Sequence, residues 1–168
     1  MRWDDLFDDL EAQVDHDHRL DVAAEVADRV RREQATVPLA DRVRAAQGAV
    51  SFALRDGSTA AGRVRSAGPG WFLLEEEGTR QVLVREDAVV SARGVPARSA
   101  APLGVVGSRR TFLMAVRALT GERVRVRTST GVVTGAITRV GADHFDVEVD
   151  QEVLVLPFGA VLTVRGPA

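Results

Sequence analysis

The clearest alternation of apolar and polar positions lies between residues 124 and 149. Val124 and Val126 alternate with arginines, and a turn then leads into a β-branched run over residues 132–140. That run contains Gly135, and a glycine inside a strand marks a bend or a close approach of another backbone. After a second turn, apolar and acidic residues alternate again. An alternation of period two is typical of half-buried strands, so the stretch predicts three consecutive antiparallel strands.

A fainter copy of this pattern occurs earlier in the chain. Alternating or β-branched runs, separated by turns such as Asp56–Gly57, predict strands at residues 50–54, 58–67, 71–76, 81–85 and 89–93. The later segment predicts two further strands, at residues 153–156 and near residue 165. Helical spacing of apolar residues predicts a short helix before each β segment, at residues 39–46 and 109–119.

The two β segments are related by an internal repeat. Phe72 corresponds to Phe145, 73 residues later, and Val84 corresponds to Leu156, 72 residues later. Each repeat therefore predicts one helix followed by five short strands. Five short, bent strands favour a small closed barrel over a sandwich, because closure removes most exposed edges. The predicted barrel cores include Phe52, Val64, Phe72, Leu74, Val126, Ile137, Phe145 and Val147.

The residues before the first repeat predict a long acidic helix over residues 3 to about 35. Trp3, Phe7 and Leu10 belong to its apolar stripe, which needs a partner surface. The predicted fold class is therefore mainly β with α. It comprises an acidic helical arm (1–36), a first barrel (37–94), a linker rich in proline and glycine (95–108) and a second barrel (109–168).

One helix followed by five strongly bent strands resembles the Sm and Sm-like proteins, which are SH3-like small barrels. Gly62 and Gly135 stand where the second strand of an Sm barrel bends, and residues 83–90 resemble the second Sm motif. Residues 1–7 also resemble the start of uncharacterised two-unit proteins from GC-rich bacteria. The Sm resemblance implies that barrels associate edge to edge, the fourth strand of one pairing with the fifth of the next. It implies a shared edge within or between chains, and a homodimer or higher oligomer.

The resemblance does not extend to the uridine pocket of Sm proteins. In those proteins an Asp and an Asn flank the turn before the third strand. Gly68 and Gly141 stand here at the Asp position, while Phe72 and Phe145 stand at the Asn position. We therefore expect RNA binding, if it occurs, to be weak and unspecific.

Composition argues against most catalytic chemistry. All 22 basic residues are arginine and there is no cysteine, so the lysine of P-loop and Schiff-base chemistry and the thiolates of metal sites are missing. The Asp and His residues at 15–18 and the lone His144 have poor spacing for a metal site, and we interpret them as surface residues. We expect no enzyme activity, no cofactor and no metal.

Charge leaves two functional alternatives open. Residues 1–28 have a net charge of −8 and the remaining residues a net charge of +6. Arginines on the predicted strands could follow a phosphate backbone, or could pair with nearby carboxylates. These nucleic-acid candidates are Arg63, Arg65, Arg85, Arg125, Arg127 and Arg139. Trp71 alternates with a core position and is predicted to face outward, where it would contact a protein or the N-terminal helix.

The leading hypothesis is a non-enzymatic assembly or interaction protein built from two fused Sm-like barrels. The alternative is an RNA-binding protein that uses arginine-rich strand faces. The expected partners are a second copy of the chain and an unknown protein. We expect a cytoplasmic protein with no membrane partner, because neither a signal peptide nor a run of ~20 apolar residues is present.

Overall fold

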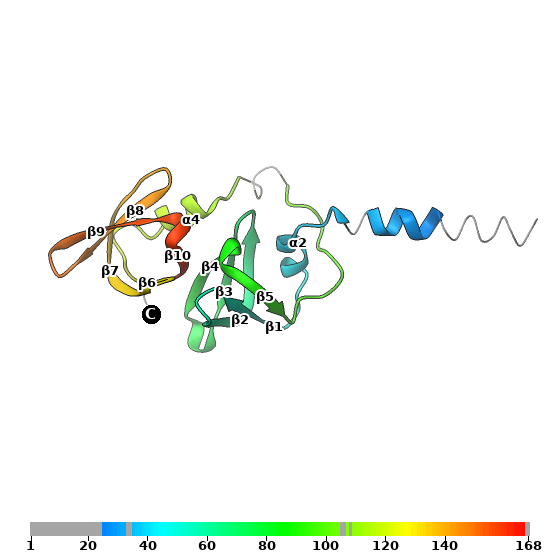
Figure 1. Ribbon diagram of the computed structural model, residues 1–168, viewed down its shortest axis with the longest axis horizontal. Helices are drawn as coiled ribbons and strands as arrows, with labels where there is room; N and C mark the ends of the chain where they lie inside the picture. Colours follow the sequence, from blue (N-terminus) through cyan, green and yellow to red (C-terminus); the bar gives the residue numbers. More distant parts are fainter. Residues whose placement is uncertain (1–24, 33–34, 105–106, 108, 167–168) are drawn as a thin grey trace, which may run out of the picture. The chain divides into compact units, whose positions relative to one another are not determined.

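The computed structural model describes residues 25–32, 35–104, 107 and 109–166. Residues 25–32 are helical, whereas the rest of the predicted N-terminal helix lies outside the described residues, together with Trp3, Phe7 and Leu10. All ten strands belong to one compact unit that begins at Pro38. The structure is thus mainly β with few helices (Figure 1).

The first β unit begins with α2 (Leu39–Arg44), which follows Pro38 because proline has no N–H to leave unpaired at a helix start. Ala40 and Val43 of this helix are buried against the strands. The five strands are β1 (Ala49–Leu54), β2 (Thr59–Gly68), β3 (Trp71–Glu75), β4 (Gln81–Arg85) and β5 (Val89–Arg93). Short 3-10 turns at Glu77–Thr79 and Glu86–Ala88 flank β4.

The second β unit repeats this order. It begins with α4 (Phe112–Arg117), capped by Thr111, whose hydroxyl oxygen accepts from the backbone N–H of Met114 at 3.4 Å. The strands are β6 (Arg123–Thr128), β7 (Gly131–Val140), β8 (His144–Val149), β9 (Glu152–Pro157) and β10 (Val161–Arg165). The predicted strands are confirmed in both units, with ends that differ by one or two residues.

The ten strands form a single antiparallel sheet in the order β5-β1-β2-β3-β4-β10-β6-β7-β8-β9. Within each unit, the fifth strand lies beside the first. Two separate closed barrels were expected, and the structure instead has one continuous sheet that is not closed. The reason is that β4 satisfies its outer edge on β10 of the other unit (Figure 1), with Val84 opposite Thr163. The expected pairing of a fourth strand with a fifth strand is confirmed, and it occurs within one chain.

Each unit bends its long second strand at a glycine. β2 pairs with β1 through its first half and with β3 through its second half, and β7 behaves in the same way. At Gly135, a Cβ atom would collide with the carbonyl oxygen of Glu148 and lie 2.7 Å from Cγ1 of Val147. Gly62 meets the carbonyl oxygen of Glu75 in the same way. The two glycines therefore allow a close approach of neighbouring strands.

We expect Gly135→Ala to lower the free energy of unfolding by about 1–3 kcal/mol, because the carbonyl it meets belongs to the β7–β8 ladder. Urea unfolding followed by circular dichroism measures this loss. Gly159→Ala is the matched control, since nothing lies within 4 Å of its Cβ position, and it should change stability by less than about 0.5 kcal/mol. Equal stabilities of the two variants would contradict this account of the bend.

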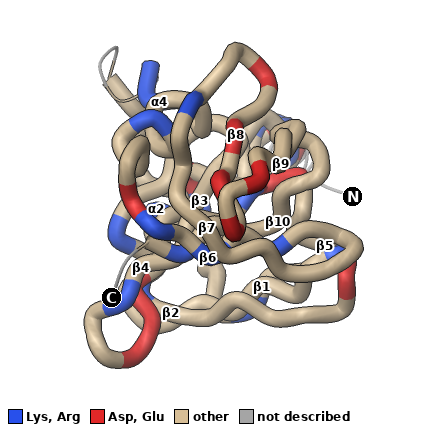
Figure 2. The backbone as a smooth tube through the Cα atoms, turned by 90° about the vertical axis from the view of Figure 1, so that its left-hand side faces the viewer, with Lys and Arg blue, Asp and Glu red and all other residues tan. Residues whose placement is uncertain are grey.

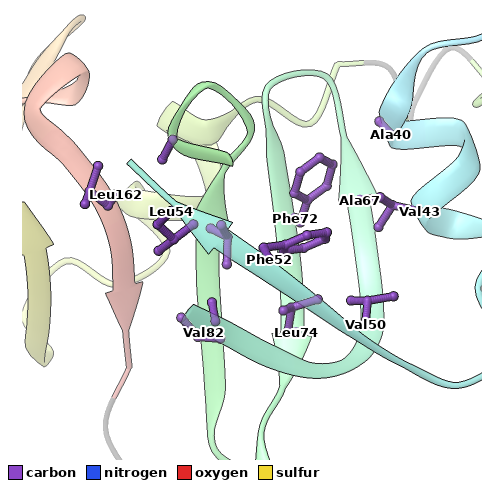
Figure 3. Packing of buried hydrophobic residues seen from close by; sticks show 13 residues of the cluster. Ala40, Val43, Val50, Phe52, Leu54, Ala67, Phe72, Leu74, Val82 and Leu162 are labelled. Carbon is purple, nitrogen blue, oxygen red and sulfur yellow. The ribbon is translucent and has the colours of Figure 1, made fainter. Parts of the chain in front are cut away.

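The buried side chains form two clusters, and seven of the eight predicted core residues lie fully inside them. Val64 is the eighth and packs at the border of the first cluster. The ring centroids of Phe52 and Phe72 lie 5.0 Å apart in that cluster. Each cluster contains residues from both repeats. Leu162 of β10, in the second unit, belongs to the first cluster (Figure 3). Trp71 and Leu83 of the first unit belong to the second cluster.

Candidate functional site

One edge of the sheet is the apolar strand β9, which pairs only with β8 among the described strands. Val153, Leu154 and Val155 are 60%, 43% and 53% exposed. Edge strands in soluble proteins are usually blunted by charges, by proline or by a covering segment. Here Glu152 and Pro157 stand at the ends of β9, so its middle presents three consecutive apolar residues and free backbone groups.

A shallow hollow of about 460 Å³ continues this apolar surface. Its walls come from the start of β7 and from the β8–β9 hairpin, and they include Val132, Val133, Val149, Val153 and Leu154. Asp150 and Glu152 also line it. Val153 and Leu154 belong both to the hollow and to the β9 edge, and we call the two together the β9 edge site.

The equivalent hollow of the first unit has different chemistry. It measures about 820 Å³ and its lining includes Arg63, Glu75, Glu76, Glu77 and Arg80. Glu76 is engaged there by Arg165, with guanidinium–carboxylate distances of 2.8 and 3.0 Å. The two units therefore each have a hollow at an equivalent place, with five charged residues in the lining of the first and five valine or leucine residues beside Asp150 and Glu152 in the second.

Most of the predicted nucleic-acid candidates are paired with carboxylates. Arg65 bonds Glu75 at 2.8 Å, and Arg139 lies 3.2 Å from Asp146. Arg85 donates to Asp87 at 3.0 Å, and its guanidinium carbon lies 5.0 Å from the centre of the Phe112 ring. These pairs neutralise the charge that a phosphate backbone would need.

Arg127 is also paired. Its partner is Asp56, which in addition accepts a hydrogen bond from Ser58. The Ser58 hydroxyl donates to Oδ1 of Asp56 at 2.6 Å and holds the pKa of that carboxyl below its usual value, while burial opposes the effect. Arg127 donates to Oδ2 of Asp56 at 3.3 Å and lowers the pKa further. Asp56 is therefore ionised at neutral pH and links the β1–β2 turn of the first unit to β6 of the second.

Arg63 and Arg125 remain, and they lie in different units. Both side chains are exposed, but Arg63 lies on β2 and Arg125 on β6, with β3, β4 and β10 between them. At ~4.8 Å per strand, four steps across a sheet correspond to roughly 19 Å. The two remaining arginines therefore do not make a common surface for a phosphate backbone.

The predicted exposure of Trp71 is wrong. Its side chain is buried in the second core cluster, and its indole N–H donates to the carbonyl oxygen of Arg110 at 2.7 Å. Gly68 lies directly beneath the indole, where a Cβ atom would approach Nε1 to 2.8 Å. The alternation along β3 predicts an exposed Trp71 only for a unit that stands alone. In the structure, the segment before α4 covers the face of β3 on which Trp71 lies.

The remaining candidates add no chemistry to the described part of the chain. The Asp and His residues at 15–18 lie outside it, and His144 bonds Asp143 through Nδ1 and Oδ1 at 2.8 Å. That contact holds the pKa of Asp143 below its ordinary value. Within residues 25–32, 35–104, 107 and 109–166, no three His, Cys, Asp or Glu side chains gather as metal ligands. Nor does any helix in these ranges have the length and apolar character needed to cross a membrane.

Sequence reasoning did not single out Val153, Leu154 and Val155 as interaction residues. A signal was available, because the repeat aligns them with Gln81, Val82 and Leu83 of the first unit. Only the strand order shows that β4 has β10 as a second neighbour, whereas β9 has no second neighbour among the described strands.

Neither a protein-family model nor a curated protein matches this chain in comparisons with known proteins. The most distinctive surfaces of the described chain are therefore the two edges of the sheet, which expose Val90 on β5 and Val153, Leu154 and Val155 on β9.

Proposed function

We propose that this protein is a non-enzymatic assembly protein made of two fused Sm-like units, which binds a protein partner by strand addition at the β9 edge site. The observation that carries the proposal is the exposure of three consecutive apolar residues in the middle of an edge strand, between Glu152 and Pro157 at its ends. An added strand pairs with free backbone groups for affinity and places alternate side chains in pockets for specificity. The hollow beside Leu154 supplies such a pocket.

The chain already uses this mode of binding internally. β10 adds to the edge of β4 with three successive residue pairs, and Leu162 enters the core of the other unit. Charged contacts accompany the pairing, such as that of Arg165 with Glu76. A β edge of this repeat is therefore suited to accept a strand, which supports the same role for β9.

Val155→Lys tests the proposal, because a lysine at the centre of β9 blocks strand addition by burying an unpaired charge. Val155 is exposed, so the variant should fold and melt as the wild type does. We expect the tagged wild-type chain, at natural abundance in an extract of its own cells, to elute in a species larger than one chain. Val155→Lys should elute as a single chain. Size-exclusion chromatography with immunodetection measures both.

Met114→Lys is the matched control. Met114 is 53% exposed, as Val155 is, but it lies on α4 and belongs to no strand. It should elute with the wild type. Elution of all three proteins as single chains would overturn the proposal, and so would loss of the complex in both variants.

RNA binding through the arginine-rich faces is the weaker alternative, because four of the six candidate arginines are engaged by carboxylates. We expect a short single-stranded RNA to bind only in the non-specific range, with Kd of roughly 10⁻⁶–10⁻⁴ M at physiological salt. Fluorescence anisotropy with oligouridine and oligoadenosine of equal length measures the affinity and its selectivity. Tight binding that favours uridine would contradict this expectation and would favour the RNA-binding alternative.

A further inference from the structure

The face of the β8–β9 hairpin that points away from the second core cluster carries a buried carboxylate. Asp146 lies on β8 directly opposite Val155 of β9, and only 9% of the residue is exposed. Its Oδ2 lies 3.2 Å from Nε of Arg139, whereas its Oδ1 is buried and accepts no hydrogen bond from any described residue. A buried carboxylate oxygen without a donor costs free energy, so an arrangement that engages both oxygens is more stable.

The contact between Asp146 and Arg139 can be exchanged for a stronger one. The side chain of Arg139 is 76% exposed, so water competes for its guanidinium. Rotation of the carboxyl group about its last side-chain bond interchanges the two oxygens, because that torsion has a broad range. A guanidinium that met both oxygens at once would form a bidentate pair, which is stronger than a single contact.

The equivalent face of the first unit is already covered. The repeat aligns Asp146 with Leu73 and Val155 with Leu83, and these two leucines also lie directly opposite each other. Leu83 is 4% exposed in the second core cluster, and Leu73 packs against that cluster. Val155 is 53% exposed, so the described residues leave the face in the second unit open. The carboxylate at the leucine position favours a cover that also donates hydrogen bonds.

Acidic residues surround this open face. Residues 131–157, which span β7 to β9, contain five acidic residues and one arginine, a net charge of −4 with histidine neutral. Glu148 is exposed on the same face as Asp146, and acidic positions gather along the β8–β9 hairpin (Figure 2). Such a charge distribution attracts basic segments and repels acidic ones.

No segment of this chain supplies a fitting basic strand at a free edge. Residues 1–28 have a net charge of −8, which the acidic face would repel. The other edge among the described strands, β5, has its one arginine at its last residue, Arg93. A basic strand that covers the face therefore comes from a different protein.

We propose that the strand added to β9 belongs to another protein and is basic, with an arginine opposite Val155 that replaces Arg139 as the partner of Asp146. Two steps across a sheet correspond to roughly 10 Å, which a long basic side chain can span over Val155. Its guanidinium donates to both oxygens of Asp146, so the buried oxygen gains a donor. Neighbouring residues of the strand point to the other face, where apolar side chains fit the hollow beside Leu154. This inference rests on the proposed function and names the chemistry of its partner.

A synthetic peptide in which arginine and valine alternate is the probe, with six residues to match the length of β9. Fluorescence anisotropy of the labelled peptide at physiological salt measures its binding to the purified full chain. We expect it to bind about tenfold more tightly than the same peptide with lysine for arginine, because an ammonium group cannot engage both oxygens at once. A peptide with glutamine for arginine should bind more weakly still.

Three variants locate the contact on the protein. Asp146→Asn should weaken binding of the arginine peptide about tenfold and remove its advantage over the lysine peptide. Arg139→Gln should strengthen binding about threefold, because the competing guanidinium is gone. Glu148→Gln is the matched control, since it removes an exposed carboxylate from the same face, and it should change binding by less than about twofold. Circular dichroism melts compare the folding of the variants with that of the wild type, and the peptide series needs no variant.

Several results would overturn the inference. They are failure of the arginine peptide to bind, equal binding of the arginine and lysine peptides, and unchanged binding to Asp146→Asn or to Val155→Lys. A purified wild type that sediments as a multimer, with Val155→Lys as a single chain, would show that a second copy occupies the site instead. If the Val155-dependent complex in extract persisted after any of these results, the proposed function would stand with a partner of other chemistry. Without that complex and without peptide binding, both would fail.

Discussion

Replacing Phe145 by alanine is expected to lower the free energy of unfolding by about 3–5 kcal/mol. Phe145 is fully buried on β8, in the second core cluster. Its ring centroid lies 6.0 Å from that of Phe158, which in turn meets the Phe112 ring edge-on at 5.3 Å. The substitution removes a large apolar side chain and leaves a cavity beneath two other rings.

Urea unfolding followed by circular dichroism measures the loss for Phe145→Ala. Met114→Ala is the control, because Met114 is exposed on α4, and its effect should stay below about 0.5 kcal/mol. A loss smaller than about 1 kcal/mol for Phe145→Ala would mean that β8 presents its other face to the core.

Leu162→Ala is expected to cost about 2–5 kcal/mol, and to weaken the first unit although Leu162 belongs to the second. Its side chain is fully buried in the first cluster, near Leu54 (Figure 3). Tryptophan fluorescence in a Trp3→Phe background follows the unfolding, because Trp71 is then the single tryptophan and lies in the second cluster. Fluorescence and circular dichroism should report one shared transition at lower urea.

A double-mutant cycle shows which core Leu162 serves. Leu162→Ala combined with Leu54→Ala should give a coupling energy of about 0.5–3 kcal/mol, the range for residues in contact. Leu162→Ala combined with Ile137→Ala should be additive within about 0.5 kcal/mol, because Ile137 belongs to the same repeat but to the other cluster. Stronger coupling to Ile137 than to Leu54 would contradict the exchange of side chains between the units.

Because the sheet is continuous, we expect the two β units to unfold together. In addition to the β4–β10 ladder, Arg127 bonds Asp56 and a guanidinium N–H of Arg55 donates to the carbonyl oxygen of Gly159 at 2.6 Å. These contacts join residues far apart in sequence, so each depends on both units being folded. Among the described strands, β5 and β9 are the two that have a neighbour on one side only.

The sequence by itself determined the ten strands, most of the core residues and the places where the long strands bend. The physical reason is local: an alternation of period two, glycines and turn residues act within a few positions of the chain. Phe72 and Phe145 could be assigned to cores because burial follows the alternation along their own strands. The pairing of a fourth strand with a fifth was implied by the resemblance to Sm proteins.

The tertiary structure alone decided which surfaces the second unit covers. Trp71 was expected to be exposed and is buried, whereas Leu83 and Val155 hold equivalent positions and differ in burial. No local pattern distinguishes them, because β4 has β10 beside its outer edge, whereas β9 has no described strand beside its outer edge. The sheet stays open for the same reason, since an edge strand binds whichever complementary edge the whole chain brings beside it.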